Sequence, residues 1–194
     1  TGDMGNEYIY MQDSGKQTIT TKGMKAEIHC VEKNAFRTVV EICHEMMVPS
    51  GMGEELQRQR EMCIDPYTRV ANRSKELVPM EVKTVLTLEK SGKGLHVATT
   101  ICNQAKDHRV RVVMPTCLNT STHLADSAFE VVKRNNRHND TWTNPCGCER
   151  QQCFAAMEDE TNGLLVANRG LYEYEVLADE ENAIAVTLLR SVAE

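Results

Sequence analysis

The sequence has no apolar run close to the ~18 residues that a membrane-spanning helix needs, and its first seven residues show no signal-peptide pattern. It also has no excess of positive charge, because its 194 residues include 22 Lys and Arg against 28 Asp and Glu, a net charge of −6. Proteins that bind nucleic acid usually carry a basic patch. We therefore expect neither a membrane segment nor a nucleic-acid partner.

Familiar catalytic motifs are absent too, since the chain has no Ser-His-Asp order, His-Glu-x-x-His sequence, P-loop or Gly-x-Gly-x-x-Gly sequence. Aromatic residues make up only 5% of the chain, with the single tryptophan at Trp142. Carbohydrate-binding modules usually display several exposed aromatic side chains on which sugars stack. These absences argue against a self-contained enzyme and disfavour a free-standing carbohydrate-binding module, which stays the alternative interpretation.

What the sequence does have is an alternation of apolar and polar residues. Between positions 81 and 89, Val82, Leu86 and Leu88 occupy one parity, and the other parity is polar or charged except at Val85. After a connection with two glycines, positions 95–101 repeat the pattern, which predicts a β-hairpin. In all, the patterning predicts strands at residues 25–31, 37–47, 81–89, 95–101, 109–114, 129–133, 152–157, 164–167, 171–177 and 184–189.

Only one segment has helical composition, at residues 53–62, and Pro66 follows it closely. Helices of ten or more residues, which would join parallel strands, are missing between the predicted strands. Because 41% of the residues are hydrophobic, the chain can form a packed core. We predict an all-β fold, an antiparallel β-sandwich with at most one short helix, in a single domain that covers residues 1–194.

The chain has eight cysteines. Cys30, Cys43 and Cys102 lie inside apolar strand-like runs, where a reduced thiol behaves as a small hydrophobic side chain. Disulfide-rich domains without a core are usually shorter and denser in cysteine. This distribution favours free thiols and a reducing compartment.

The remaining candidate for metal binding is a cluster around Cys146, Cys148 and Cys153, with His138 upstream. Structural zinc sites commonly use paired Cys-x2-Cys or His-x3-His units. The spacing here is Cys-x-Cys-x4-Cys with one distant histidine, which favours loop thiols without a metal. We therefore expect no metal ligands in this chain. A metal-binding structural domain stays a further alternative that rests on this cluster alone.

Arg190 continues the parity of Ile184, Val186 and Leu188 and is expected to point toward the buried side with them. An arginine in that position needs a carboxylate, backbone carbonyls or a bound ligand as its partner. A structural ion pair and a contact to another domain or to substrate both stay open.

The first ten residues combine turn formers with two tyrosines, Tyr8 and Tyr10. A tyrosine on such a loop offers a ring and a hydroxyl that suit a sugar, although simple packing is equally compatible. Glu173 and Glu175 lie two residues apart on one predicted strand. A glycosidase needs two carboxylates that face each other across the sugar, so we predict that this pair lies on a solvated face.

Several segments together resemble one family. Residues 103–116 (NQAKDHRVRVVMPT), 125–134 (ADSAFEVVKR), 168–176 (NRGLYEYEV) and 185–192 (AVTLLRSV) are similar, in this order, to blocks in the C-terminal β region of glycoside hydrolase family 38. Residues 2–8 (GDMGNEY) resemble the start of that region. The family comprises α-mannosidases and bacterial mannosylglycerate hydrolases.

The resemblance implies a zinc-dependent retaining α-mannosidase whose catalytic barrel precedes this chain. The family's His/Asp/Asp/His zinc site and Asp nucleophile lie in the barrel and its neighbouring helical domain, so these 194 residues would hold no catalytic residue and no zinc. The chain would be a non-catalytic β-sandwich of the galactose-mutarotase-like supersandwich type. It would pack on the barrel and the helical domain of the same polypeptide and form part of the wall around the terminal mannose.

By the family pattern, Tyr8 is the candidate for a tyrosine that reaches the sugar. Arg190 is the candidate for an arginine near the pocket, and Arg134 competes with it. The resemblance further implies a cytoplasmic bacterial enzyme that acts on a mannose-containing substrate, either an oligosaccharide or mannosylglycerate. It is also compatible with a full-length enzyme that forms a homo-oligomer. The abrupt ends of the sequence agree with a segment taken from a longer polypeptide.

Overall fold

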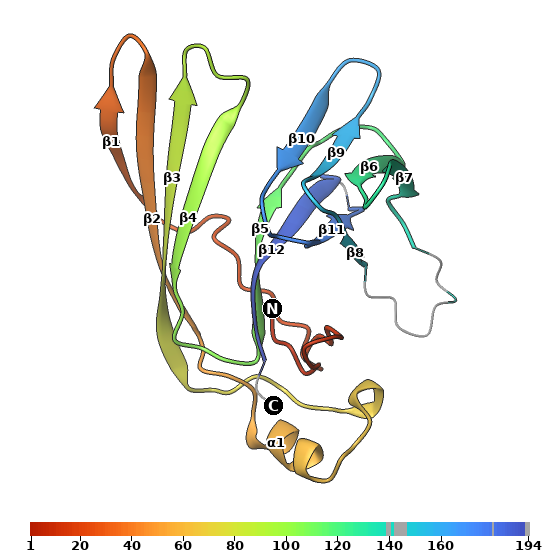
Figure 1. Ribbon diagram of the computed structural model, residues 1–194. Coiled ribbons are helices and arrows are strands. Elements are labelled where there is room, and N and C mark those ends of the chain that lie inside the picture. The colour runs from red at the N-terminus through yellow and green to blue at the C-terminus, as the bar shows by residue number, and fades with distance from the viewer. Residues whose placement is uncertain (139–140, 142–146, 180, 193–194) are drawn as a thin grey trace. The chain divides into compact units, whose positions relative to one another are not determined.

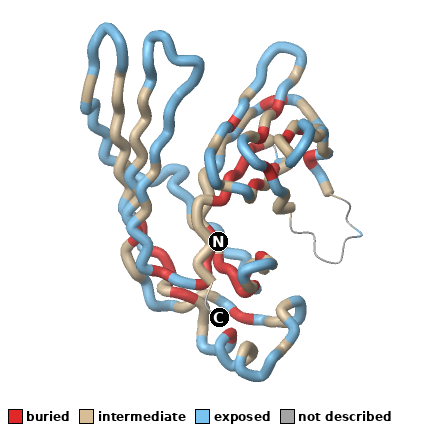
Figure 2. Tube along the Cα trace, viewed as in Figure 1, coloured by how far each residue is buried: buried red, intermediate tan, exposed pale blue. Residues whose placement is uncertain are grey.

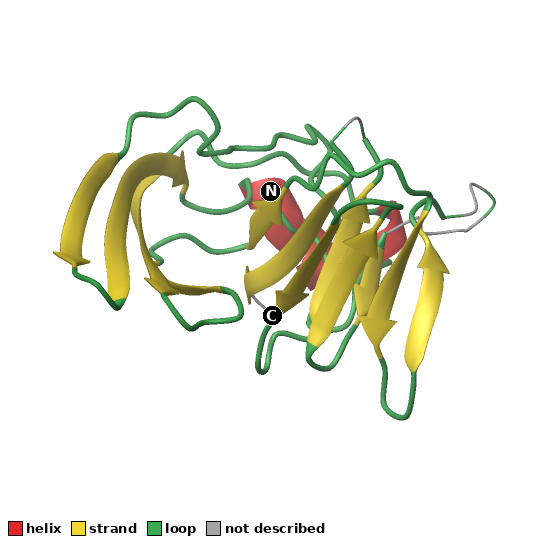
Figure 3. Cartoon of the chain, turned by 90° about the horizontal axis from the view of Figure 1, so that it is seen from above, coloured by secondary structure: helices red, strands yellow, loops and turns green. Residues whose placement is uncertain are grey.

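The computed structural model describes residues 1–138, 141, 147–179 and 181–192. Its regular structure consists almost wholly of strands (Figures 1 and 3). The elements are β1 (Glu27–Lys33), β2 (Arg37–Pro49), α1 (Glu54–Glu61), a 3-10 turn (Pro66–Thr68), β3 (Leu77–Glu89), β4 (Leu95–Cys102), β5 (His108–Met114), β6 (Thr122–Asp126), β7 (Val131–Asn135), β8 (Cys148–Arg150), β9 (Phe154–Glu158), β10 (Gly163–Ala167), β11 (Glu173–Leu177) and β12 (Ala183–Ser191).

The predicted fold class is confirmed. Every strand pairing whose register is described is antiparallel, and α1 is the one α-helix in the described residues. Two short strands, β6 and β8, were missing from the prediction, and β3 begins at Leu77 rather than at Glu81. Within the described ranges, no helix is long and apolar enough to cross a membrane.

The chain forms two compact units. Unit 1 comprises Thr1–Met4, Gln12–His108 and Val192–Glu194, and unit 2 comprises Gly5–Met11 and Arg109–Ser191. The N-terminal segment is thus divided, with its first four residues in one unit and the next seven in the other. That residues 1–194 behave as a single domain stays a prediction.

Unit 1 is built on a four-stranded sheet in the order β1-β2-β3-β4. The long strands β2 and β3 pair continuously from Arg37 opposite Glu89 to Pro49 opposite Leu77. Met46 and Met80 pair directly near the C-terminal end of β2, which leads toward α1. They are 8% and 2% exposed. Helix α1 buries Leu56 alone, because its other side chains are polar or charged.

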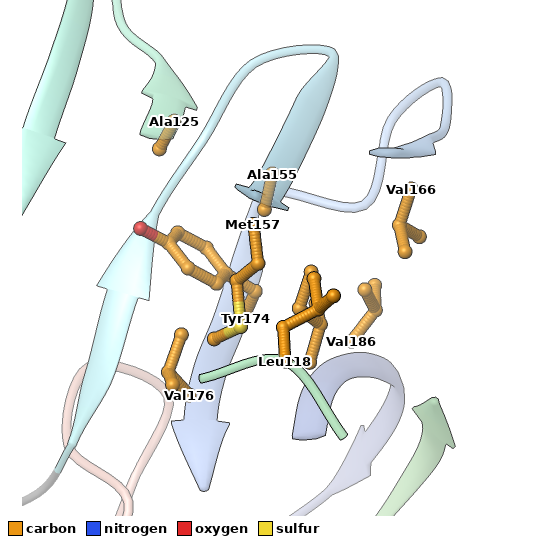
Figure 4. Packing of buried hydrophobic residues seen from close by; sticks show 9 residues of the cluster. Leu118, Ala125, Ala155, Met157, Val166, Tyr174, Val176 and Val186 are labelled. Atoms are coloured by element: carbon orange, nitrogen blue, oxygen red, sulfur yellow. The ribbon is translucent and has the colours of Figure 1, made fainter. Parts of the chain in front are cut away.

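Unit 2 is a two-layered sandwich. One sheet has the order β10-β9-β6-β7 and the other the order β5-β12-β11-β8. Alternate residues of the strands point into one core, in which Tyr174 and Ile184 are both 0% exposed. The buried core consists of Leu118, Ala125, Ala155, Met157, Val166, Tyr174, Val176, Ile184 and Val186 (Figure 4).

Strand β6 escaped prediction because a histidine takes one of its inward positions. His123 is 3% exposed, and its Nε2 atom lies 2.8 Å from the Tyr174 hydroxyl. Its Nδ1 atom donates to Asn136 Oδ1 over 3.0 Å, since the amide nitrogen of Asn136 already donates to the Thr120 carbonyl. A polar residue that finds such partners can occupy a core position without the apolar pattern that marks a strand.

Candidate functional site

Residues 6–9 form a tight turn, here called the Tyr8 turn. The side-chain oxygen of Asn6 accepts hydrogen bonds from the backbone N–H groups of Tyr8 and Ile9, both over 2.9 Å. The Asn6 N–H donates to the Ile9 carbonyl over 3.0 Å, which closes the turn. The Tyr8 side chain is left 83% exposed. The asparagine therefore fixes the backbone through its own side chain and leaves the tyrosine ring in solvent.

Arg190, near the end of β12, holds this turn from the other side. Its Nη2 atom donates to the Asn6 carbonyl over 2.8 Å and to the Ile9 carbonyl over 3.1 Å. One cation thus binds both ends of the Tyr8 turn, although the sequence separates them from it by more than 180 positions. Carbonyls are one of the three kinds of partner that the parity of Arg190 indicated. The fold brings the two predicted site residues to one place.

Tyr10, directly after the turn, lies between two guanidinium groups. The Cζ atom of Arg109 is 3.5 Å from the Tyr10 ring centroid, and that of Arg190 is 5.9 Å from it. A cation over a tyrosine ring is attracted by the ring's negative face. Because Tyr10 is only 9% exposed, these contacts lie away from bulk water. They anchor the segment that carries Tyr8 to strands β5 and β12.

Arg109 is itself the centre of a buried cluster in unit 2, with its side chain 3% exposed. It lies 2.7 Å from Cys148 Sγ, 3.4 Å from Glu173 Oε1 and 3.3 Å from Glu175 Oε2. Burial by itself lowers the pKa of Arg109, but the neighbouring Cys148, Tyr10 and Glu175 raise it above its ordinary value. The guanidinium therefore stays charged and holds these groups around it.

The expectation that Glu173 and Glu175 lie on a solvated face is wrong. Their side chains are only 28% and 21% exposed, and Arg111 also pairs with Glu175. Thr187 donates to Glu173 over 2.6 Å. The strand order β5-β12-β11-β8 sets the arginines of β5 and the carboxylates of β11 on one face of the sheet, with β12 between them. These carboxylates pair with the two arginines of β5.

Sequence reasoning missed Arg109 and Tyr10 as parts of this site. The available signal was complementary charge on two strands, with Arg109 and Arg111 at alternate positions of one and Glu173 and Glu175 at alternate positions of the other. Such ladders indicate paired faces only when the strand order is known. Strand β12 separates them, and no local pattern predicts that order.

Arg134, the competitor of Arg190, contacts a different part of unit 2. It donates to the Tyr174 hydroxyl and to the Arg150 carbonyl, both over 2.8 Å, and pairs with Glu149 over 2.9 Å. Burial raises the pKa of Tyr174. Burial also opposes the charge of Glu149, but His123 and Arg134 together lower the pKa of that carboxyl. These contacts give Arg134 a structural role beside the core, and they place no atom of it on the Tyr8 turn.

The predicted cysteine cluster is only partly described. Cys146 lies outside the described residues, Cys148 contacts Arg109, and Cys153 is exposed with a free thiol. His138 Nε2 lies 3.6 Å from Glu149 Oε1. Within the described ranges, no group of three or more His, Cys, Asp and Glu side chains could hold a metal ion.

Comparison with known proteins identifies the family. The sequence profile of the family described as "Glycosyl hydrolases family 38 C-terminal domain" matches residues 1–194. This chain belongs to that family. The family that the sequence blocks indicated, glycoside hydrolase family 38 in its C-terminal β region, is thereby confirmed.

The relatives within family 38 are much longer than this chain. It is 40% identical over 193 residues to a Halalkalibacterium halodurans protein that has been provisionally named a mannosylglycerate hydrolase. The alignment covers 100% of this chain and 21% of that relative. It matches the crystal structure of an α-mannosidase from Enterococcus faecalis V583 with a TM-score of 0.95 and 43% identity, over 100% of this chain and 22% of that one. A second Enterococcus faecalis structure, of a family 38 protein, matches with a TM-score of 0.92 and 41% identity.

The chain therefore spans about a fifth of the length of the family 38 relatives that it matches. A family 38 zinc site would need a cluster of carboxylate and imidazole ligands. The described residues of this chain do not offer one.

Proposed function

We propose that this chain is a non-catalytic β domain of a longer family 38 enzyme, a zinc-dependent retaining α-mannosidase that removes terminal α-mannose residues. The domain packs on the catalytic barrel and the helical domain of the same polypeptide. It presents the Tyr8 turn at the wall of the sugar pocket. The substrate is a mannose-containing molecule, and the enzyme is cytoplasmic and bacterial.

The observation that carries this proposal is the construction of the Tyr8 turn. A tyrosine ring that is 83% exposed is held on a turn fixed by Asn6 and by two hydrogen bonds from Arg190. Because the backbone of the turn is already fixed, little backbone freedom is lost when Tyr8 binds a sugar. The similarity to an α-mannosidase and to a protein named as a mannosylglycerate hydrolase supports mannose as the sugar.

Other observations support the remaining parts of the proposal. A reducing compartment is supported by the free thiols at Cys30, Cys43, Cys63, Cys102, Cys117 and Cys153. In this proposal, the chain contributes no catalytic carboxylate and no zinc ligand. The catalytic groups would then come from the other four-fifths of the enzyme.

The test is a kinetic comparison in the complete polypeptide. We expect Tyr8→Phe to lower kcat/KM on an aryl α-mannoside by about 5- to 150-fold, since one hydrogen bond to the transition state contributes about 1–3 kcal/mol. Arg190→Ala should lower kcat/KM by a comparable factor, because it releases the turn that positions Tyr8. The matched control is Tyr172→Phe, another exposed tyrosine of unit 2 at 63% exposure, which should leave the kinetics unchanged.

Three results would contradict the proposal. Unchanged kinetics in Tyr8→Phe would remove the tyrosine from the pocket, and turnover by the 194-residue chain alone would contradict a non-catalytic role. Full activity of the complete enzyme after zinc has been removed with a chelator would contradict zinc dependence. Tight binding of mannose oligosaccharides by the isolated chain would instead favour the carbohydrate-binding module.

A further inference from the structure

The sheet of unit 1 has two chemically different faces. On one face, the register places Glu41 opposite Val85, Cys43 between Glu27 and Lys83, and Glu81 opposite Cys102. Lys83 pairs there with Glu41 over 2.5 Å. This charged face is suited to water.

The opposite face is largely apolar. One row across the sheet consists of Cys30, Val40, Leu86 and Val97, and the next consists of Ile28, Ile42, Thr84 and Thr99. A third row consists of Lys33, Thr38, Leu88 and Leu95. Lys33, on the edge strand β1, is the one charged residue in these three rows. We call the side chains of these rows the apolar face of the β1–β4 sheet.

Much of this apolar face is in solvent. Ile28 is 64% exposed, Leu88 55%, Leu95 53% and Val97 46%. The same face is buried only toward the other end of the strands, at Met46 and Met80. Figure 2 shows this change along the sheet, from pale blue at the β1–β2 and β3–β4 turns to red lower on the strands. The described chain therefore covers one end of the face and leaves its larger part bare.

A bare apolar face of four strands is unusual on a finished protein and marks a surface of contact. Transient interfaces are only about as apolar as the remaining protein surface, whereas permanent contacts resemble a domain core. An amphipathic sheet normally buries its apolar face against another layer of the same fold. The composition of this face, aliphatic side chains and threonines with Lys33 as the one charge at its edge, fits such a permanent layer.

We propose that the apolar face of the β1–β4 sheet is the docking surface for an apolar face of the same polypeptide, supplied by residues outside these 194. This inference rests on the proposed function, in which the chain is one domain of a longer enzyme. The family 38 structure that this chain matches with a TM-score of 0.95 has more than four times its length, so ample polypeptide exists to cover the sheet. A second copy of the chain is the competing occupant.

Three cysteines provide a built-in test, because they lie on opposite faces. Cys30 belongs to the apolar face, and Cys43 and Cys102 belong to the charged face, with Cys30 and Cys102 exposed in this chain. In the purified complete polypeptide, labelling with N-ethylmaleimide is followed at each cysteine by peptide mass spectrometry, with and without denaturant. We expect native Cys30 to react at least about tenfold more slowly than in denaturant, while Cys102 reacts at nearly its denatured rate.

The other outcomes decide against the proposal. Native Cys30 reacting at its denatured rate would show that the apolar face is bare in the complete protein. Protection of both Cys30 and Cys102 would show that covering is not specific to this face. Protection of Cys30 that disappears on dilution to a monomer, as judged by light scattering, would assign the face to a second copy.

A pair of variants gives an independent readout. Val97→Lys places a charge on the apolar face, and Val85→Lys places the same charge on the opposite face of the adjacent strand. In the complete polypeptide, Val97→Lys should expose Cys30 to the reagent and lower the unfolding midpoint by about 5 °C or more, while Val85→Lys should do neither. Equal effects of the two variants would overturn the assignment of the face. Mannosidase activity, measured on the same samples, reports separately on the proposed function.

Discussion

The two units of this chain use the same alternation of apolar and polar residues with opposite results. In unit 2, β11 and β12 bury Tyr174 and Ile184 completely, because a second sheet lies over them. In unit 1, Ile28 and Leu88 belong to a largely apolar face and are 64% and 55% exposed. Alternation determines which face of a strand is apolar, but the partner layer determines whether that face is buried.

The difference extends to charge. Unit 2 contains Arg109, whose side chain is 3% exposed among Glu173, Glu175 and Cys148. On the sheet of unit 1, Lys83 pairs with Glu41, and this cation is 50% exposed. A buried cation needs partners placed around it by several strands, whereas an exposed pair needs only two neighbouring side chains. The interior of unit 2 is therefore closed off from water, whereas the apolar face of the unit 1 sheet is still largely exposed.

The strongest way to break this comparison is to remove the buried cation. Arg109→Met should lower the free energy of unfolding of the 194-residue chain by about 3–5 kcal/mol, because it leaves Glu173 and Glu175 partly buried without that partner. Lys83→Met, on the exposed pair of unit 1, should change it by no more than the experimental error. Chemical denaturation measures both. A small loss for Arg109→Met would mean that the cluster is not buried in solution.

A matched pair of isoleucines sharpens the comparison of apolar faces. Ile184→Ala in β12 should cost about 2–5 kcal/mol of unfolding free energy, since a fully buried side chain is replaced by a cavity. Ile28→Ala in β1 should cost less than about 1 kcal/mol in the 194-residue chain, because most of that side chain is already in water. Chemical denaturation again provides the measurement. Equal losses would show that the apolar face of unit 1 is covered within this chain.

The smallest expected effect is a difference in pH dependence between the units. Burial lowers the pKa of His108 in unit 1, so the unfolded chain binds a proton more readily than the folded one. Stability is then fully present above about pH 6.5 and declines as the pH falls through the folded pKa. The pKa of Glu149 in unit 2 is lowered by His123 and Arg134 against the effect of burial, so its contribution is lost only below about pH 4.5.

Unfolding free energies measured from pH 7.5 down to about pH 2.5 test this order. His108→Gln should flatten the decline that begins near pH 6.5, and Glu149→Gln should flatten only the part at lower pH. His96→Gln, at an exposed position on the sheet of unit 1, is the control and should leave the profile unchanged. A decline that begins near pH 6.5 in spite of the His108 substitution would contradict the assignment.

Much of the fold could be predicted because strands of five or more residues with regular alternation leave a clear pattern. The hairpin of β3 and β4 is the best example, with pairs from Glu81 opposite Cys102 to Leu88 opposite Leu95. Strand β8 could not be predicted, because three residues carry no period. For the candidate site, the sequence suggested Tyr8 and Arg190 singly, and their role at a sugar pocket stays a prediction. Arg109 and Tyr10 became visible only once the strand order was known.

By itself, the sequence determined the all-β class, the apolar parity of the long strands, the family, and two residues of the candidate site. These are properties of local pattern or of ordered blocks along the chain. Tertiary structure alone decided that Arg190 binds both ends of the Tyr8 turn, that Glu173 and Glu175 surround Arg109, and that one sheet is covered while another is bare. The physical reason is that burial and pairing depend on which distant segment lies opposite a residue, and alternation along a strand specifies only the direction in which its side chain points.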